Sequence, residues 1–307
     1  MQLKSKDLLG IRDLSKEEID LIIETAETMK HVISSNNKKT SHLVGKSIIT
    51  LFYENSTRTR LSFELAAKFM SANAANISAS SSSVSKGETL IDTGRTIDVM
   101  GTDVVIMRHD MSGAPHLLAR NIKASVINAG DGMNEHPTQA LLDVFTMKER
   151  YGQVCGLKVA IIGDVLHSRV ARSNIWALQK LGAEVRVFGP NTLLPVGIEE
   201  LGVQKCKSLK EALTGVDVVM GLRVQMERQG KGMFPSAREY SKFFGVDQEA
   251  LKFAKDDVLI MHPGPVNRGV ELTSWVVDCE NSVIDEQVRN GVAIRMAILY
   301  LLMRREA

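Results

Sequence analysis

The strongest constraint on the fold is an alternation between short apolar runs and segments with helical periodicity. The apolar runs are continuous, which indicates strands buried on both faces of a sheet. Helical segments between successive strands are typical of parallel βαβ units. The sequence therefore predicts an α/β fold with two doubly wound parallel-sheet domains linked by helices. The runs lie at residues 47–52, 103–107, 124–127, 158–162, 184–188, 216–220 and 257–261.

The expected domain boundary follows from where this pattern restarts. The chain has 307 residues, room for about two domains. A helix is expected over residues 137–150, and the next apolar run begins only at 158. We therefore expect one domain over residues 1–150 and a second over 151–283. The last helix, within residues 284–307, is expected to pack back on the first domain.

Two further helices show local signals. Ser15 and Glu18 form an S-x-x-E capping box, so a helix is expected to begin after Ser15. Its apolar residues repeat at helical spacing. A second helix is expected after the run at 47–52, with an apolar face of three residues. The first face is Ile19, Ile22, Ile23, Ala26 and Met29, and the second is Leu61, Leu65 and Phe69.

Composition excludes several classes of protein. Lys and Arg number 38 and Asp and Glu number 36, so the net charge of +2 favours neither a nucleic-acid partner nor a membrane surface. The longest apolar stretch, residues 292–303, is interrupted by Arg295 and is shorter than the roughly 20 residues that span a bilayer. We expect a cytoplasmic protein.

The cysteines support the same setting. Cys155, Cys206 and Cys279 lie far apart, and none belongs to a C-x-x-C motif. We therefore expect neither a zinc cluster nor a disulfide framework, and a reducing compartment.

The segment Ser56-Thr57-Arg58-Thr59-Arg60 carries the clearest chemical signal. It lies where an expected strand ends and a helix begins. A helix N-terminus offers unpaired N–H groups and the positive end of the dipole, and Arg suits bidentate contacts with phosphate. The segment predicts an anion site, although an ordinary Ser/Thr cap beside a solvated Arg is an open alternative.

A second candidate segment precedes the helix at 137–150. Pro137 suits the first turn of a helix, and His136 and Gln139 are three residues apart. Both side chains can therefore point from the helix start toward one ligand, His136 to a carbonyl oxygen and Gln139 to an amide. The alternative is a capping histidine on a surface turn.

More candidate residues follow other strands. Ligands of open α/β sheets bind outside the carboxyl ends of the strands. Arg108, Arg169 and Arg223 each follow an apolar run, and Gly264 lies in a Pro-Gly-Pro turn that can aim a carbonyl at a ligand. Surface arginines and a purely structural turn are the open alternatives. The absence of G-x-G-x-x-G disfavours a nicotinamide site.

The serine-rich stretch at residues 78–85 has the composition of a flexible linker and leads into Lys86. Together with Lys86 and His136, four arginines at strand ends indicate a small, strongly anionic pair of substrates. They are Arg58, Arg108, Arg169 and Arg223. The sequence shows no Ser-His-Asp arrangement, no paired carboxylates and no cluster of metal ligands.

These motifs occur in an order that resembles a known family. The chain carries STRTR, SKGET, MRH, HPTQ, RVQ and HPGPxNRG, which span nearly its whole length. This set resembles the catalytic chains of the aspartate carbamoyltransferases, within the transcarbamylase family. STRTR with HPTQ is typical of transcarbamylases, and RVQ with HPGP indicates aspartate as the acceptor. The HCLP and SMG motifs expected of an ornithine enzyme are absent.

The resemblance implies an activity and an assembly. The carbamoyl group of carbamoyl phosphate would pass to the amine of L-aspartate, giving N-carbamoyl-L-aspartate and phosphate in pyrimidine (UMP) biosynthesis. No cofactor and no metal are implied. The chain would form a homotrimer with active sites shared between neighbours, and a separate regulatory or pathway-enzyme chain is a further expected partner.

The resemblance also assigns roles to residues. The phosphate would be held by Ser56, Thr57, Arg58 and Thr59, with Ser82 and Lys86 reaching in from the neighbouring subunit. Thr59, Arg108 and His136 would polarise the carbamoyl oxygen, and Gln139 would bind the amide. Arg58, Thr59, Lys86, Arg108 and His136 are the catalytic set.

The aspartate site is implied in the same way. Arg169 would bind the α-carboxylate, Arg223 and Gln225 the β-carboxylate, and the carbonyl of Gly264 the reacting amine. Lys86 and Pro265 complete this site. On this assignment the serine-rich stretch is an active-site loop.

The chain differs from some relatives at two positions, and three other functions were weighed against this one. Some relatives have a lysine where this chain has Ser85, and a leucine where it has Gly264. The alternatives are a transcarbamylase for ornithine or putrescine, a non-catalytic scaffold relative, and a Rossmann-type dehydrogenase. Arg223 argues against an amine-bearing second group, because a cation suits a second carboxylate.

Overall fold

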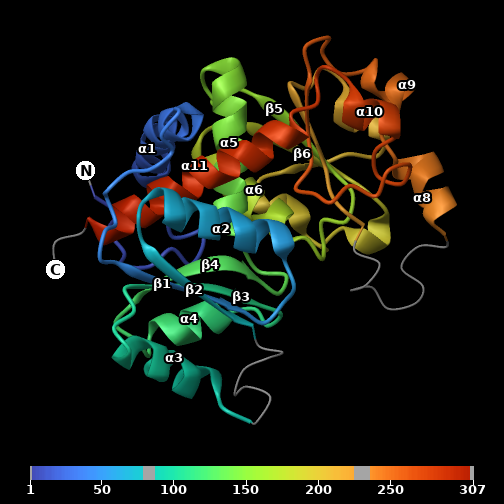
Figure 1. The fold of residues 1–307 in the computed structure, drawn as a ribbon. Coiled ribbons are helices and arrows are strands. Elements are labelled where there is room, and N and C mark those ends of the chain that lie inside the picture. Colours follow the sequence, from blue (N-terminus) through green and yellow to red (C-terminus); the bar gives the residue numbers. More distant parts are fainter. Residues whose placement is uncertain (1, 79–86, 225–235, 305–307) are drawn as a thin grey trace. The chain divides into compact units, whose positions relative to one another are not determined.

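The computed structural model describes residues 2–78, 87–224 and 236–304 (Figure 1). It separates into two compact units, residues 1–142 with 289–307 and residues 143–288. Both divisions fall inside helices, α5 (Pro137–Tyr151) and α11 (Ile284–Met303). These two helices therefore contribute residues to both units.

The first unit contains a four-stranded parallel sheet of order β2-β1-β3-β4. It is built from β1 (Ser47–Phe52), β2 (Asn73–Ser78), β3 (Val104–His109) and β4 (Ser125–Asp131). Three of these strands confirm the apolar runs of the sequence. β2 was not predicted, because its sequence NAANIS is mostly small or polar and forms a strand through pairing with β1. Ser78 ends this strand, so it is not part of a linker as expected.

Four helices belong wholly to this unit: α1 (Lys16–Ser34), α2 (Thr57–Phe69), α3 (Leu90–Val99) and α4 (Ala114–Ala119). The capping box of α1 is present in full, and its five predicted apolar residues are buried, so both predictions are confirmed. The predicted apolar side of α2, with Leu61, Leu65 and Phe69, lies within one helix but is not its buried face. Leu61 is 51% exposed, and α2 instead buries a face of smaller residues around Phe63. The buried residues of α2 are Thr59, Ser62, Phe63, Ala66 and Ala67.

The sheet packs against α3 and α4 through an aliphatic core. Burying each of its larger side chains contributes roughly 1.5–3 kcal/mol. Members of this core include Leu51, Val105, Met107, Leu118, Ile122 and Val126.

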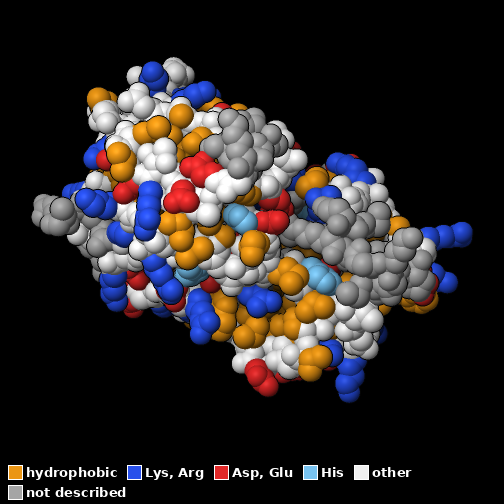
Figure 2. Space-filling view, turned by 90° about the horizontal axis from the view of Figure 1, so that it is seen from below, with side chains coloured by type: hydrophobic (Ala, Val, Ile, Leu, Met, Phe, Trp, Pro, Cys, Tyr) orange, Lys and Arg blue, Asp and Glu red, His pale blue; other side chains and the backbone are white. Residues whose placement is uncertain are grey.

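Large apolar side chains remain exposed on and beside α3 and α4. Val99 is 88% exposed, Met100 78%, Met111 67% and Leu117 46%. Figure 2 views the molecule from below, the side on which Figure 1 places α3 and α4, and shows apolar side chains among Lys and Arg. Where exposed apolar side chains form a contiguous patch, they often mark a contact surface.

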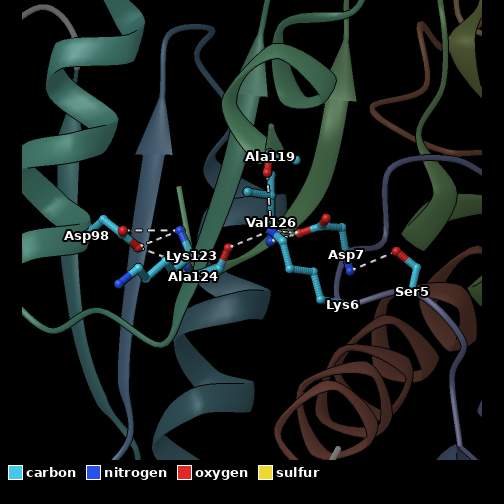
Figure 3. A network of polar contacts seen from close by, with 8 residues as sticks. All are labelled: Ser5, Lys6, Asp7, Asp98, Ala119, Lys123, Ala124 and Val126. Carbon is cyan, nitrogen blue, oxygen red and sulfur yellow. Dashed lines mark hydrogen bonds and ion pairs between the residues drawn. The ribbon is translucent and has the colours of Figure 1, made fainter. Parts of the chain in front are cut away.

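The N-terminal segment covers the edge of β4 (Figure 3). Leu8 N–H donates to the carbonyl of Val126 (2.9 Å), and Val126 N–H donates to Asp7 Oδ1 (2.8 Å). Lys6 Nζ donates to the same carboxylate (2.9 Å) and to the carbonyl of Ala124 (3.2 Å). These bonds satisfy backbone groups that an exposed edge strand would leave unpaired.

The second unit contains a five-stranded parallel sheet of order β7-β6-β5-β8-β9. Its strands are β5 (Lys158–Ile162), β6 (Glu184–Phe188), β7 (Gln204–Lys205), β8 (Val218–Gly221) and β9 (Leu259–Met261). Four of them confirm the predicted apolar runs. β7 was missed because its two residues are exposed and polar.

Short helices cover this second sheet. They are α6 (Arg169–Lys180), η3 (Asn191–Leu193), η4 (Ile198–Leu201), α7 (Leu209–Leu213), α8 (Ala237–Phe244), α9 (Gln248–Leu251) and α10 (Ser274–Asp278). A buried apolar cluster, with members from β5, β8, β9 and α7, forms the core. The predicted α/β class with two parallel sheets is therefore confirmed. Across the described ranges no helix is long and apolar enough to cross a membrane.

Both sheets reverse their strand order at one point. In the first sheet the chain moves from β1 outward to β2 and then returns to β3 on the other side of β1. In the second it moves from β5 to β6 and β7 and returns to β8. Such switch points lie at the carboxyl ends of adjacent strands and are where open α/β sheets bind ligands.

Candidate active site

The N-terminus of α2 lies beside the switch point of the first sheet. Ser56 caps the helix, because its Oγ accepts a hydrogen bond from Thr59 N–H (3.4 Å). Thr57 and Arg58 are exposed and Thr59 is buried. The first turn therefore presents backbone N–H groups, hydroxyls and a guanidinium beside the carboxyl end of β1. This arrangement can bind a small anion.

Arg108 lies on the other side of the same switch point, near the end of β3. Its Nη1 is 3.5 Å from Thr59 Oγ1, and its Nη2 donates to Glu54 Oε1 (3.2 Å). Its carbonyl accepts from Tyr53 N–H (2.9 Å). The structure thus brings together two residues that the sequence predicted. Glu54 was missed, although a carboxylate just before a cationic loop is a signal that could have indicated an ion pair.

His109 follows Arg108 and has an unusual titration. Burial lowers the pKa of His109, although the neighbouring Asp110 carboxylate acts in the opposite direction. Its ring packs on Tyr53 with centroids 4.6 Å apart, and its Nδ1 accepts from Met111 N–H (2.9 Å). Nδ1 also lies 2.8 Å from Asp110 Oδ1, but desolvation is the larger effect. Burial therefore favours the neutral form of the ring that follows Arg108.

The loop between β4 and α5 is held by two buried carboxylates. Asp131, with no exposed surface, accepts from Gly113 N–H (2.7 Å) and from Glu135 N–H (3.1 Å). Glu135 in turn accepts from the backbone N–H groups of Ile11 (2.7 Å) and Arg12 (3.2 Å). The loop is therefore tied both to the segment before α4 and to the N-terminal segment.

Gly10 makes this contact with the N-terminal segment possible. A Cβ at this position would collide with Glu135 Oε1. The close approach of backbone and carboxylate therefore requires glycine here.

His136 and Gln139 lie at the start of α5, as their spacing predicted. His136 is 4% exposed and Gln139 is 9% exposed. The hydroxyl of Thr138 is 3.5 Å from His136 Nδ1, and Gln139 N–H donates to the carbonyl of His136 (3.0 Å). The anchored loop thus fixes the position of both residues next to the carboxyl end of β4.

Arg295 was noted in the sequence only as a break in an apolar stretch. In the structure it is buried on α11 and donates to Ser62 Oγ on α2 (2.9 Å). Its Nη2 is 3.5 Å from Thr138 Oγ1 on α5, and its guanidinium lies 5.0 Å from the ring centre of Phe63. Arg295 therefore links the two helices whose first turns carry the site residues of this unit.

The second unit has a comparable edge. Arg169 is the first residue of α6, follows β5 and is 4% exposed. Arg223 lies two residues after β8, and Gly264 and Pro265 follow β9. Because β5, β8 and β9 are neighbours in the sheet, these residues lie along one edge. Ser82, Lys86 and Gln225 lie outside the described residues.

Fold and site together define the protein as one with two α/β units, each with a candidate site for a small anion. Each unit is a parallel sheet with arginines on both sides of its switch point, so each can bind a small anion at that edge. In the part of the chain that the structure describes, no group of three His, Cys, Asp or Glu side chains could hold a metal ion.

Comparison with known proteins identifies the family. Residues 6–149 match the aspartate/ornithine carbamoyltransferase carbamoyl-P binding domain, and residues 155–302 match the Asp/Orn binding domain of that family. The chain belongs to the aspartate/ornithine carbamoyltransferase family. The resemblance stated from the motifs is thereby confirmed.

Individual relatives are similar over almost their full length. A protein of Ruminiclostridium cellulolyticum is 72% identical over 305 residues, 99% of this chain and 97% of the relative. A protein of Acetivibrio thermocellus is 69% identical over 307 residues, 100% of this chain and 98% of the relative. Both relatives are named aspartate carbamoyltransferase catalytic subunit.

Solved structures show the same fold. Aspartate transcarbamoylase from Trypanosoma cruzi, in complex with carbamoyl aspartate and phosphate, is 31% identical with a TM-score of 0.89 and coverage of 97% and 96%. Ornithine carbamoyltransferase from Pyrococcus furiosus is 30% identical with a TM-score of 0.88, and each chain is covered in full. The fold is thus common to enzymes named for two different acceptors.

The anchoring role of Glu135 is open to a stability test. Glu135→Ala removes both acceptors from the Ile11 and Arg12 N–H groups. Each unsatisfied donor costs about 1–3 kcal/mol, so we expect a loss of about 2–6 kcal/mol in the free energy of unfolding, measured by urea denaturation. Glu24→Ala, at an exposed position of α1, is the control and is expected to change stability by less than about 0.5 kcal/mol. Equal stability of the two variants would contradict the anchoring role.

Proposed function

We propose that this chain transfers the carbamoyl group of carbamoyl phosphate to the amine of L-aspartate, giving N-carbamoyl-L-aspartate and phosphate. The observation that carries the proposal is the pair of switch points, each flanked by arginines: Arg58 and Arg108 in one unit, and Arg169 and Arg223 in the other. One substrate is a phosphate ester and the other a dicarboxylate, so both need cations. The names of the relatives support the same reaction, and with it a place in pyrimidine (UMP) biosynthesis.

The first domain, residues 1–150 with 284–307, binds carbamoyl phosphate. Its phosphate is held by the first turn of α2 through Ser56, Thr57, Arg58 and Thr59. Arg108, Thr59 and His136 polarise the carbamoyl oxygen, and Gln139 binds the amide nitrogen. The Glu54 contact supports the role of Arg108, because it holds one side of the guanidinium and orients it beside Thr59.

The second domain, residues 151–283, binds aspartate. Arg169 binds the α-carboxylate, and Arg223 with Gln225 binds the β-carboxylate. The carbonyl of Gly264 accepts a hydrogen bond from the reacting amine, beside Pro265. Arginine suits both carboxylates, because a guanidinium group can pair with a carboxylate bidentately.

The reaction is a direct attack. The neutral amine of aspartate attacks the carbamoyl carbon, and negative charge grows on the carbamoyl oxygen. Donors that are already oriented stabilise this charge, as in an oxyanion hole. The carbamoyl C–O bond to phosphate then breaks, and phosphate leaves with the bonding electrons and takes up the proton that the amine nitrogen loses. Its charge is held at the N-terminus of α2. Holding both substrates in attack geometry supplies much of the acceleration, and no covalent enzyme intermediate forms.

The assembly is a homotrimer in the cytoplasm. The exposed apolar side chains on and beside α3 and α4 support a contact between copies of the chain. Ser82 and Lys86 enter the site of the neighbouring subunit, where Lys86 contacts both substrates. Three free cysteines suit a reducing compartment. The relatives' name, catalytic subunit, supports a separate regulatory or pathway chain as a partner.

The choice of acceptor tests the proposed function. Purified protein is supplied with carbamoyl phosphate and either L-aspartate or L-ornithine, and the ureido product is measured. We expect product with aspartate only, because Arg223 suits a second carboxylate and repels an ammonium group. Product with ornithine would contradict the aspartate assignment, and absence of product with both would favour a non-catalytic relative.

The role of Arg58 has its own test. If Arg58 stabilises the phosphate and the charge of the transition state, Arg58→Ala is expected to lower kcat on the order of 10²–10³. Steady-state kinetics with aspartate measure the change. Lys68→Ala, at an exposed position near the end of the same helix, is the matched control and should leave kcat unchanged. A loss of less than about tenfold would refute the role.

Sharing of the site between subunits predicts complementation. Arg58→Ala and Lys86→Ala chains are each expected to be nearly inactive alone. Every mixed trimer contains one site with an intact Arg58 from one chain and an intact Lys86 from its neighbour. Activity is therefore expected to return when the two variants are denatured and renatured together. Hybrids that stay inactive would mean that each site lies within one subunit.

A further inference from the structure

His262 and Glu271 form a buried pair in the second unit to which no role has yet been assigned. His262 directly follows β9, and Glu271 lies in the loop before α10. Their side chains are 0% and 2% exposed, and His262 Nε2 is 3.3 Å from Glu271 Oε1. Burying a carboxylate and an imidazole costs free energy unless both groups are paired or hydrogen-bonded, so their contacts were followed through the unit.

The first contact connects His262 to Gly264. Gly264 N–H donates to His262 Nδ1 over 2.8 Å. Nδ1 therefore carries no proton, and the neutral ring has its proton on Nε2, facing Glu271. The hydrogen bond made at one ring nitrogen sets which nitrogen carries the proton, and the Glu271 carboxylate faces the protonated side. The backbone of Gly264 has a φ of +62°, so its peptide groups are oriented by this turn and by the ring together.

The second contact connects Glu271, through Asn267, to the segment that follows β8. Its Oε1 accepts from Asn267 N–H over 2.7 Å. The Asn267 side-chain amide donates to the carbonyl of Val224 over 3.3 Å. Val224 directly follows Arg223, so Glu271 links the loop after β9 to the end of β8.

A third set of contacts reaches α6. His262 N–H donates to Gln287 Oε1 (3.0 Å), and Gln287 Nε2 donates to Asp143 Oδ1 (2.7 Å). Asp143 Oδ2 accepts from Asn174 Nδ2 (2.8 Å), and Asn174 belongs to the helix that begins with Arg169. One buried network therefore joins the three elements that carry Arg169, Arg223 and Gly264.

We propose that His262 and Glu271 are positioning residues for the acceptor amino acid. They do not contact substrate themselves. They hold the Gly264 carbonyl and the segment at Arg223 in the geometry that binds aspartate. This inference rests on the proposed function, because it needs aspartate as the acceptor bound at this edge. Misplacement by even an ångström can cost on the order of 10²-fold in rate, so the network is expected to affect aspartate kinetics strongly.

The test compares variants of His262 in the full-length protein. His262→Ala removes the acceptor for Gly264 N–H, and we expect the KM for aspartate to rise about 10- to 100-fold while the KM for carbamoyl phosphate changes less than about twofold. His262→Asn returns an oxygen near the position of Nδ1 and is expected to recover most of the aspartate KM. Glu271→Gln keeps the shape of the side chain but removes its charge. It is expected to raise the aspartate KM about threefold or more, and it carries the test if His262→Ala does not fold.

Asp217→Asn is the matched control. Asp217 is also a buried carboxylate of this unit, but it binds Lys158 N–H (2.8 Å) and Lys255 just before β8, at the opposite edge of the sheet. Its substitution is expected to lower the melting temperature without changing the ratio of the two KM values. A general loss of stability lowers the folded fraction and therefore the apparent kcat, and it leaves the ratio of the two KM values unchanged.

The outcomes separate the two proposals. An active wild-type enzyme whose His262→Ala and Glu271→Gln variants keep the wild-type KM for aspartate would overturn the positioning role and leave the proposed function intact. Equal increases in both KM values would also overturn it. A wild-type protein without activity toward aspartate would overturn the proposed function, and the positioning role with it.

Discussion

A parallel sheet covered by helices leaves its strand ends as the places where polar side chains can meet a ligand. Both units of this chain obey that constraint. β1, β3 and β4 in one unit, and β5, β8 and β9 in the other, are buried over most of their length, and the candidate site residues lie at or after their carboxyl ends. Reversal of the strand order then brings cationic residues from separate segments to one edge. The binding chemistry of the protein is thus a consequence of how its sheets are ordered.

Cations at these edges have to be held in place, and buried polar contacts do this in both units. In the first, Glu54 contacts Arg108, and Asp131 with Glu135 anchors the loop that carries His136. In the second, the contacts of His262 and Glu271 join the loops after β8 and β9. Such groups are costly to bury, and partly satisfied networks are worse than apolar packing. Their presence beside both edges is consistent with geometry being the property that they maintain.

The sequence was sufficient for the parts of the fold that depend on local pattern. Continuous apolar runs predicted seven strands, and the capping box at Ser15 predicted the start of α1. Residues such as Arg108 and Arg223 could be selected as site candidates because a cation directly after a buried run is conspicuous. β2 could not be predicted, since its small side chains carry no apolar pattern and it forms through pairing with β1. The buried face of α2 was not predicted, because the helix packs through Phe63 and small residues that carry no strong apolar pattern.

The polar networks were beyond the reach of the sequence for a related reason. Arg295 contacts Ser62 and Thr138, and His262 contacts Glu271, across separations that no local pattern encodes. A histidine or arginine in such a place looks like any other until its partners are known. Long-range pairs of this kind are decided by the fold, so they become visible only with it.

The central claim is that the two sheet edges bind the two halves of one reaction, phosphate in one unit and a dicarboxylate in the other. A neighbouring structure, the Trypanosoma cruzi aspartate transcarbamoylase, was solved with N-(phosphonacetyl)-L-aspartic acid, a single molecule that carries both groups. The most direct measurement is a crystal structure of this protein with the same compound. The account predicts the phosphonate at the first turn of α2, in contact with Arg58, and the carboxylates on Arg169 and Arg223. A phosphonate bound elsewhere, or carboxylates held by other residues, would contradict it.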